Sequence, residues 1–255
     1  MSYLSSIEEA LPPTIVRSVR RCGGSVLRML IAQWGPKLLG TLTHAETDEP
    51  LVALTFDDGP HPEFTPQLLD VLDRHQAKAT FFMIGTRAQA CPDLVDRVAK
   101  AGHTIGNHTW DHADMTKIGH RGRRKQLERC SKLLEPYASG LFRPPWGYQT
   151  LWSRIDTLGY EVVAWSVHAR DWIVLDTNVL TRTLEDEIRP GSIVLLHDAI
   201  WDPIVDGASN RAPVIKAVDN LLAKLGSQYQ FVTVPELIRR GRPARGNWFN
   251  PVLWW

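Results

Sequence analysis

Two adjacent carboxylates, Asp57 and Asp58, follow the apolar run 51–56 and precede Gly59-Pro60. The apolar run predicts a short buried strand that stops at the Gly-Pro pair. Because neighbouring side chains on an extended backbone point in opposite directions, the two carboxylates can have different roles there. One could bind a metal while the other remains free as a base. Asp, Gly and Pro are also common turn residues, so these residues alone leave a plain turn open.

Two histidines, His108 and His112, lie four residues apart in the segment N-H-T-W-D-H. On a helical turn they would share one face and could bind one ion. Together with a carboxylate from another strand end, they predict a site of two histidines and one carboxylate. Such a site leaves coordination positions open for water and substrate, as catalytic metal sites do. A His-x-x-x-His pair is common, however, and by itself does not establish a metal site.

Three more reactive side chains stand at predicted strand ends. Arg143 opens the motif R-P-P-W-G, Asp171 lies in R-D-W, and His197 ends the apolar run L-L-H. Taken singly, the arginine fits a solvated edge charge, and the His-Asp pair at 197–198 fits a cap or a core contact. Core packing gives no reason for reactive residues to recur at strand ends, so together they indicate a site.

The elements that must position these residues alternate along the chain from residue 51. Short apolar runs followed by helical patterns predict a parallel sheet with helices outside it. About seven such units, without a dinucleotide-binding glycine pattern, favour a (β/α) barrel, in which chemistry gathers at the carboxyl ends of the strands. We expect strands at 51–56, 79–85, 104–107, 140–143, 161–165, 192–196 and 231–233, and helices at 86–101, 116–137, 150–158, 177–189 and 213–225.

Five motifs occur in the order T-F-D-D-G-P, H-T-W-D-H, R-P-P-W-G, R-D-W and L-L-H. In this order they resemble the motifs of the polysaccharide deacetylase family, the carbohydrate esterases of family 4 with a NodB-homology domain. The resemblance runs from about residue 50 to about residue 235. It implies a distorted barrel and hydrolysis of N-acetyl or O-acetyl groups. It also implies a divalent metal, most often zinc, with cobalt, nickel or manganese as alternatives.

The resemblance also assigns catalytic roles to single residues. It implies that Asp57 is the general base and that Arg143 orients it. It implies that His197 is the acid that protonates the departing amine and that Asp171 supports its charged form. The metal ligands that it implies are Asp58, His108 and His112.

A substrate pocket follows from the same resemblance. The backbone N–H of Trp146 would face the developing oxyanion, and Trp172 and Leu195 would form an apolar pocket for the acetyl methyl group. Pro145, beside Trp146, is expected to contact substrate as well. The chain departs from the family where tryptophan replaces the tyrosine of R-x-P-Y, and at His168, where some relatives carry an acidic residue.

The composition excludes several classes of protein. A formal net charge of +1 over 255 residues gives no basic excess for nucleic-acid binding. Cys22, Cys91 and Cys130 lie too far apart for a C-x-x-C metal pair or a disulfide framework. No apolar stretch has the length of a membrane span. The first residues lack the pattern of a secretory signal, so a cytoplasmic protein, or one peripheral to the membrane, is expected.

We expect three segments along the chain: a basic amphipathic helical extension at 1–50, the NodB-homology domain at 51–240, and a Trp-rich tail at 241–255. Apolar residues and arginines recur at helical spacing over 14–40. This pattern fits peripheral contact with a membrane, as does the tail, but it also fits a surface helix packed on the domain. The oligomeric state does not follow from these residues.

The predicted function is metal-dependent hydrolysis of an N-linked acetyl group on an amino sugar or glycan, with release of acetate. The predicted partner is therefore an acetylated carbohydrate. Hydrolysis of another amide or of an O-acetyl ester is the alternative, because the same motifs would serve it. A carbohydrate-binding pseudoenzyme is a third interpretation, although neither the base nor a metal ligand is missing.

Overall fold

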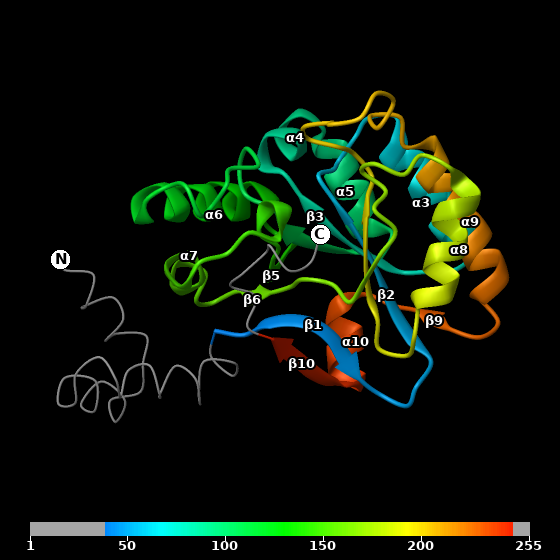
Figure 1. Cartoon of the computed structure of the whole chain (residues 1–255). Helices are drawn as coiled ribbons and strands as arrows, with labels where there is room; N and C mark the ends of the chain where they lie inside the picture. Colours follow the sequence, from blue (N-terminus) through cyan, green and yellow to red (C-terminus); the bar gives the residue numbers. More distant parts are fainter. Residues whose placement is uncertain (1–38, 247–255) are drawn as a thin grey trace.

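The strand that ends at the two carboxylates is β2 (Leu51–Asp57), and each of its residues is buried. In the computed structural model, which describes residues 39–246, β2 lies in the middle of the sheet (Figure 1). Its neighbours are β3 (Ala79–Met83) and β8 (Ile193–His197). A strand covered on both faces has a continuous apolar sequence, which explains the run at 51–56.

Parallel pairing extends from β2 in both directions. The strands follow the order β6-β5-β4-β3-β2-β8-β7, and β9 pairs with the first residues of β2. This curled sheet of seven parallel strands with outer helices confirms the predicted distorted (β/α) barrel (Figure 1). The other strands are β4 (Thr104–Asn107), β5 (Ala138–Phe142), β6 (Glu161–Val162), β7 (Val167–His168) and β9 (Gln230–Phe231).

Helices connect most successive strands of the parallel sheet, as the alternating pattern predicts, but β7 follows β6 without a helix between them. The single helix expected at 86–101 is wrong: the structure has α4 (Gly85–Ala90) and α5 (Pro92–Lys100). Cys91, with φ −133°, separates them because the residue before a proline is driven away from helical geometry. The other helices are α3 (Phe64–Arg74), α6 (His120–Leu134), α7 (Leu151–Asp156), α8 (Thr177–Glu187), α9 (Ala212–Leu225), α10 (Val234–Arg240) and the 3₁₀ turn η1 (Pro145–Gly147).

Alternate residues of β2 pack into two different cores. Leu54 and Phe56 belong to the large core that includes residues of α3, α8 and α9. Leu51 and Ala53 belong to a second core with residues of β1 and α10. Since side chains alternate along a strand, Asp57 points to the same face as Leu51 and Ala53. The first carboxylate of the pair therefore points to the face of the second core.

An antiparallel pair, β1 (Thr41–Glu46) and β10 (Arg242–Gly246), joins segments that the expected boundaries assigned to the extension and the tail. β1 forms a bridge to Val163 beyond β6 and another to Ser192 before β8. Its Ala45 N–H donates to the carbonyl of Gly191 at 2.9 Å. β1 therefore contacts the chain just after β6, an edge strand of the sheet, and just before β8.

Two predicted features lie outside the described residues: the basic amphipathic segment before residue 39 and the Trp-rich residues 247–255. Within residues 39–246, no helix combines the length and apolar character that crossing a membrane requires.

Candidate active site

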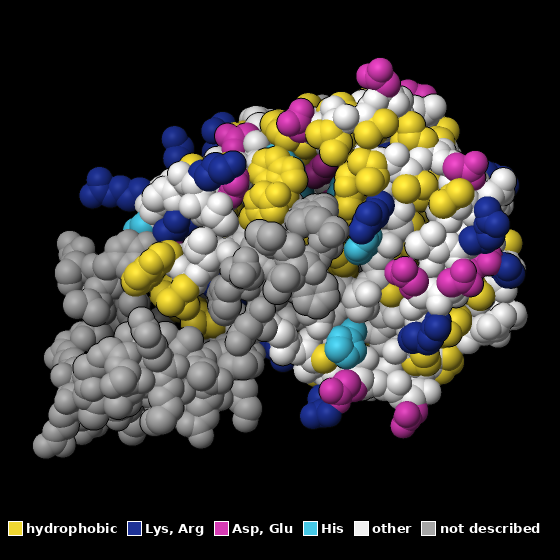
Figure 2. Space-filling model, viewed as in Figure 1, with side chains coloured by type: hydrophobic (Ala, Val, Ile, Leu, Met, Phe, Trp, Pro, Cys, Tyr) yellow, Lys and Arg dark blue, Asp and Glu magenta, His cyan; other side chains and the backbone are white. Residues whose placement is uncertain are grey.

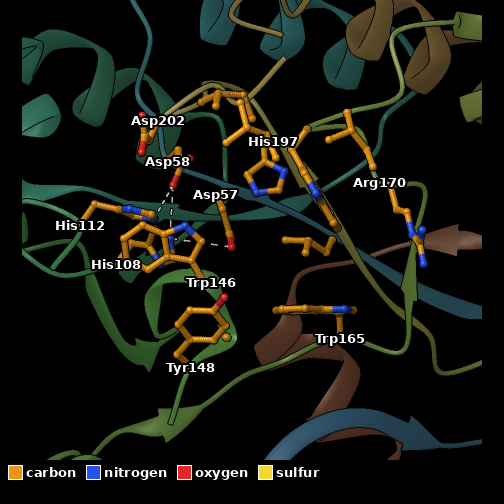
Figure 3. Close-up of a pocket in the computed structure, with 16 residues that line it drawn as sticks. Asp57, Asp58, His108, His112, Trp146, Tyr148, Trp165, Arg170, His197 and Asp202 are labelled. Carbon is orange, nitrogen blue, oxygen red and sulfur yellow. Dashed lines mark ion pairs between the residues drawn. The ribbon is translucent and has the colours of Figure 1, made fainter. Parts of the chain in front are cut away.

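The carboxyl ends of the strands bring together the polar residues that were predicted to form a site. Asp57 is the last residue of β2 and His197 the last of β8, while His108 and Arg143 directly follow β4 and β5. A cavity of about 550 Å³ opens at this end of the sheet (Figure 3). Strand order, rather than sequence proximity, therefore assembles the cavity.

Asp58, His108 and His112 place three ligand atoms in a small volume. Oδ1 of Asp58 lies 3.3 Å from Nε2 of His108 and 3.1 Å from Nε2 of His112. All three side chains are buried, and their ligand atoms lie within 4.8 Å of one another. Two ligands of a tetrahedral ion, each about 2.0–2.1 Å from it, are about 3.3 Å apart. The spacing therefore fits a single ion held by all three residues.

Hydrogen bonds leave the appropriate ligand atoms free. Nδ1 of His108 donates to the backbone carbonyl of Arg143 at 2.7 Å, so the lone pair on Nε2 faces Asp58. Oδ2 of Asp58 accepts from the Trp201 N–H at 2.9 Å, whereas Oδ1 is buried and accepts no hydrogen bond from the described residues. Burial lowers the pKa of His112, which favours the neutral imidazole that binds metals. A cation would satisfy the otherwise unpaired Oδ1.

The two histidines do not share a helical turn, so that part of the prediction is wrong. They lie on an irregular loop after β4, in which Thr109 has φ +69° and His112 has φ +57°. Asp58, opposite them, has φ +71°. Such left-handed values are unfavourable for residues other than glycine and persist where surrounding contacts hold them. The N–H of Thr109, for example, donates to the side-chain oxygen of Asn107 at 2.8 Å.

Asp57 is held by Arg143 rather than by the candidate metal ligands Asp58, His108 and His112. Its Oδ1 accepts from Nη1 of Arg143 at 2.7 Å, and its Oδ2 lies 4.0 Å from Nε2 of His108. Arg143 is fully buried and also donates to the Thr55 hydroxyl and to two backbone carbonyls. A guanidinium held by so many acceptors fixes the carboxylate that it touches. The other oxygen of Asp57 thus remains directed toward the candidate metal ligands.

His197 forms a second charged group in the cavity wall. Its Nδ1 lies 2.9 Å from Oδ1 of Asp171, and its backbone N–H donates to Oδ2 of the same carboxylate at 2.9 Å. Arg211 donates to that Oδ2 at 2.7 Å. Burial alone would lower the pKa of His197, but Asp171, with smaller contributions from Asp58 and Asp57, outweighs burial and raises it to about 9. His197 is therefore protonated at neutral pH and can donate a proton.

The cavity wall includes three of the four residues predicted to contact substrate. Trp146, Trp172 and Leu195 line it, whereas Pro145 is buried in η1 and is not among the lining residues. Trp146 has φ +53°, and its ring centroid lies 4.3 Å from that of His112. Their contact with substrate, and the role of the Trp146 N–H, remain predictions.

Sequence reasoning missed several residues that shape the site. Thr55 could have been found, because it lies two positions before Asp57 on the same strand face. Arg211 could not, since the salt bridge to Asp171 joins residues far apart in the chain and no motif surrounds it. Trp165 and Tyr148 add further aromatic surface to the cavity wall.

The mouth of the cavity is apolar. Figure 2 shows hydrophobic side chains on either side of a hollow in which histidine and acidic groups are visible. Ile204 of the loop after β8 lines the cavity and is 74% exposed. The other large exposed hydrophobic residues that line the cavity are Trp146 and Ile173, and Trp201 and Val205 accompany Ile204 on its loop.

Residues 44–163 match the family model described as polysaccharide deacetylase. The chain is 39% identical over 199 residues to a peptidoglycan-N-acetylglucosamine deacetylase of Bacillus cereus, a match covering 75% of this chain and 90% of that protein. It is 41% identical over 199 residues to a chitooligosaccharide deacetylase of Sinorhizobium fredii, covering 73% of this chain and 91% of that protein.

The structure matches those of solved deacetylases as well. A crystal structure of a peptidoglycan N-acetylglucosamine deacetylase superposes with a TM-score of 0.73 at 30% identity. The match covers 83% of this chain and 98% of that one. The similarity therefore includes the strands whose ends form the cavity.

Proposed function

The chain belongs to the polysaccharide deacetylase family, and we propose that it hydrolyses the acetamido group of an N-acetylglucosamine unit within a glycan. The products are acetate and the free amino sugar. The relatives are named for peptidoglycan and for chitooligosaccharides, and both substrates carry N-acetylglucosamine. The single observation that supports the proposal most is that two adjacent carboxylates in one cavity have different contacts. Asp57 pairs with Arg143, whereas Asp58 faces His108 and His112.

Asp58, His108 and His112 are the residues that would hold a divalent cation, and we propose zinc. Two imidazoles and one carboxylate are a common ligand set of catalytic zinc sites. When bound, the ion would supply Lewis-acid chemistry that would polarise the acetyl carbonyl and acidify a water molecule. The unpaired Oδ1 of Asp58 and the tautomer of His108 support this assignment.

Asp57 acts as the general base in this proposal. Its Oδ1 is occupied by Arg143, so the second oxygen is free to take a proton from the attacking water. That oxygen faces the candidate metal ligands, at 4.0 Å from Nε2 of His108. Fixing the carboxylate before the reaction removes the cost of orienting it during the reaction.

His197 acts as the general acid. When the C–N bond breaks, the leaving nitrogen needs a proton, and the imidazolium beside Asp171 can supply it. Asp171 is fully buried and does not line the cavity, so it acts through His197. Arg211 neutralises and orients Asp171 in turn.

The acetyl group would occupy the apolar part of the cavity. Trp172 and Leu195 line it, and the ring centroids of Trp172 and His197 lie 5.7 Å apart. A methyl group placed there would bring the scissile nitrogen near the imidazolium. The left-handed backbone at Trp146 agrees with its proposed N–H contact with the oxyanion, because strained residues cluster at active sites.

Acetate release from defined substrates tests the proposal. We expect release from N-acetylglucosamine oligosaccharides or from peptidoglycan fragments, loss of release after chelation, and recovery when zinc is restored. Acetylated xylan serves as the O-ester substrate in parallel. Release from the xylan alone would replace the proposal with O-deacetylation, and no release from any substrate by the metal-loaded protein would favour a binding protein.

A further inference from the structure

Arg87 on α4 lies outside every motif that predicted the site, yet it contacts two of the loops that form it. Its Nη1 donates to the backbone carbonyl of Asp58 at 2.9 Å, and its Nη2 donates to the backbone carbonyl of Ile200 at 2.9 Å. Its guanidinium carbon lies 5.4 Å from the ring centroid of Trp201. Among residues 39–246, no carboxylate forms an ion pair with Arg87, so these carbonyls are its main polar partners.

The carbonyl of Ile200 and the N–H of Trp201 belong to the same peptide group. That N–H donates to Oδ2 of Asp58 at 2.9 Å. One peptide group is therefore held at its oxygen by the Arg87 guanidinium and at its nitrogen by the carboxylate. A positive charge at the carbonyl polarises the peptide, which strengthens the N–H as a donor.

This arrangement determines which oxygen of the Asp58 carboxylate faces the two imidazoles. With Oδ2 occupied, Oδ1 is the oxygen that faces both imidazoles, at 3.3 Å from His108 and 3.1 Å from His112. The bond from Arg87 to the Asp58 carbonyl also helps to hold the backbone at φ +71°. Residues that orient a metal ligand through hydrogen bonds commonly contribute strongly to metal affinity.

The same guanidinium holds the rim of the cavity. Ile200 itself, Asp202 and Ile204 line the cavity and belong to the loop after β8. Arg87 anchors that loop at its first lining residue, Ile200. Loss of the anchor is therefore expected to affect both the metal ligand and the surface on which a glycan would lie.

We propose that Arg87 is a positioning residue: through the peptide group between Ile200 and Trp201 it orients the Asp58 carboxylate and thereby sets metal affinity. The inference rests on the proposed function, because it assumes that Asp58 is a metal ligand. Arg87 acts through Asp58 and is not itself a ligand in this arrangement.

The test compares Arg87→Met, Arg87→Lys and the control Arg97→Met in the full chain. Arg97 is an exposed arginine that pairs with Asp70 away from the cavity. Zinc dissociation constants are measured by competition with a chromophoric chelator, and unfolding midpoints are measured on the metal-free proteins. We expect Arg87→Met to raise the zinc dissociation constant about 10–100-fold, as loss of such a supporting residue commonly does. Arg97→Met should leave it unchanged.

The lysine variant separates charge from geometry. Lysine keeps the positive charge but lacks the planar fork that reaches two carbonyls, so an intermediate dissociation constant is expected. With zinc saturating, both Arg87 variants should also raise KM, since the rim loop has lost its anchor.

A zinc dissociation constant within about threefold of wild type in Arg87→Met would overturn the inference. So would a lower unfolding midpoint with unchanged zinc affinity, because that pattern describes a purely structural residue. If Arg87→Met does not fold, Arg87→Lys carries the test by the same criterion. Failure of the wild-type protein to bind zinc would instead refute the proposed function, so the two failures are distinguishable.

Discussion

Asp57 and Asp58 are chemically identical and adjacent, and they differ in what reaches their oxygens. Arg143 occupies one oxygen of Asp57, whereas a backbone N–H occupies one oxygen of Asp58 and leaves the other facing two imidazoles. Environment therefore makes one residue suited to be a base and the other a ligand.

The imidazolium of His197 gives a prediction about pH. Because the protonated form is the proposed acid, kcat/KM should fall as pH rises through the pKa of His197, which lies at about 9 without a cation and lower with one bound at Asp58. In Asp171→Asn, this alkaline limb should move to lower pH, since the main group that raises the pKa has lost its charge. An unchanged limb in pH–rate profiles of this variant would contradict the role of His197.

The same pair affects stability with the sign that a raised histidine pKa requires. The stabilisation from the His197–Asp171 pair is fully present below pH about 6.5, the usual histidine value. It is lost as pH rises toward 9, where the folded protein releases the proton.

Much of the site could be predicted at the residue scale because the five motifs are local in sequence. The three candidate metal ligands, Asp57 and His197 were all named from short segments, and the structure brings them together at one cavity. The contacts between segments that are distant in sequence were not predicted. Arg87 and Arg211 lie outside the motifs, and their partners are largely backbone carbonyls and a buried carboxylate.

At the scale of elements, the start of α4 is hydrogen-bonded to the loop that carries His108 and His112. The Gly85 N–H donates to the carbonyl of Thr109, and the N–H of Thr86 donates to that of Trp110. A Cβ at Gly85 would lie 2.5 Å from Cε3 of Trp110 and 3.2 Å from its Cα. The loop between the two histidines therefore packs directly against the first residue of α4, where there is no room for a side chain at Gly85.

Gly85→Ala should consequently displace the histidine loop. We expect a loss of about 1–3 kcal/mol in the free energy of unfolding, typical of overpacking, together with weaker zinc binding. Gly122→Ala on α6 is the matched control, because its Cβ would meet Ile118 at an ordinary 3.5 Å and alanine favours helices. Denaturant unfolding and zinc titration of both variants check this, and equal behaviour would rule out the contact with Trp110 as a constraint.

Strands that contain an apolar run were predictable, even where the strand itself is short. The expected runs include β2, β3, β4 and β8, and they overlap β5, β6 and β9, the last two of which have only two residues each. β1, β7 and β10 were not expected: β7 has two residues and β10 reads R-P-A-R-G. Such segments form strands because a neighbouring strand is available to pair with them, and the local sequence carries no information about that neighbour. The histidine loop was predicted as a helical turn for a similar reason: its backbone is set by contacts with other segments.

At the scale of the whole molecule, the order of the parallel strands brings the residues of the site together. β2 and β8 are neighbours although about half the chain separates them, and this places Asp57 beside His197 in register. β4 and β5 are likewise adjacent, which allows the Arg143 carbonyl to fix the tautomer of His108. Alternating β and α units predicted the barrel, but the order of its strands came from the structure.

The central claim is that Asp57 is the base and Asp58 the metal ligand, and one paired measurement on the whole protein tests it. Zinc content per chain and acetate release are determined on the same preparations of wild type, Asp57→Asn and Asp58→Ala. We predict that Asp57→Asn keeps its zinc but loses acetate release by about 10²–10⁴-fold, the usual contribution of a general base. Asp58→Ala should lose both. Full acetate release by Asp57→Asn, or loss of zinc from it as complete as from Asp58→Ala, would contradict the account.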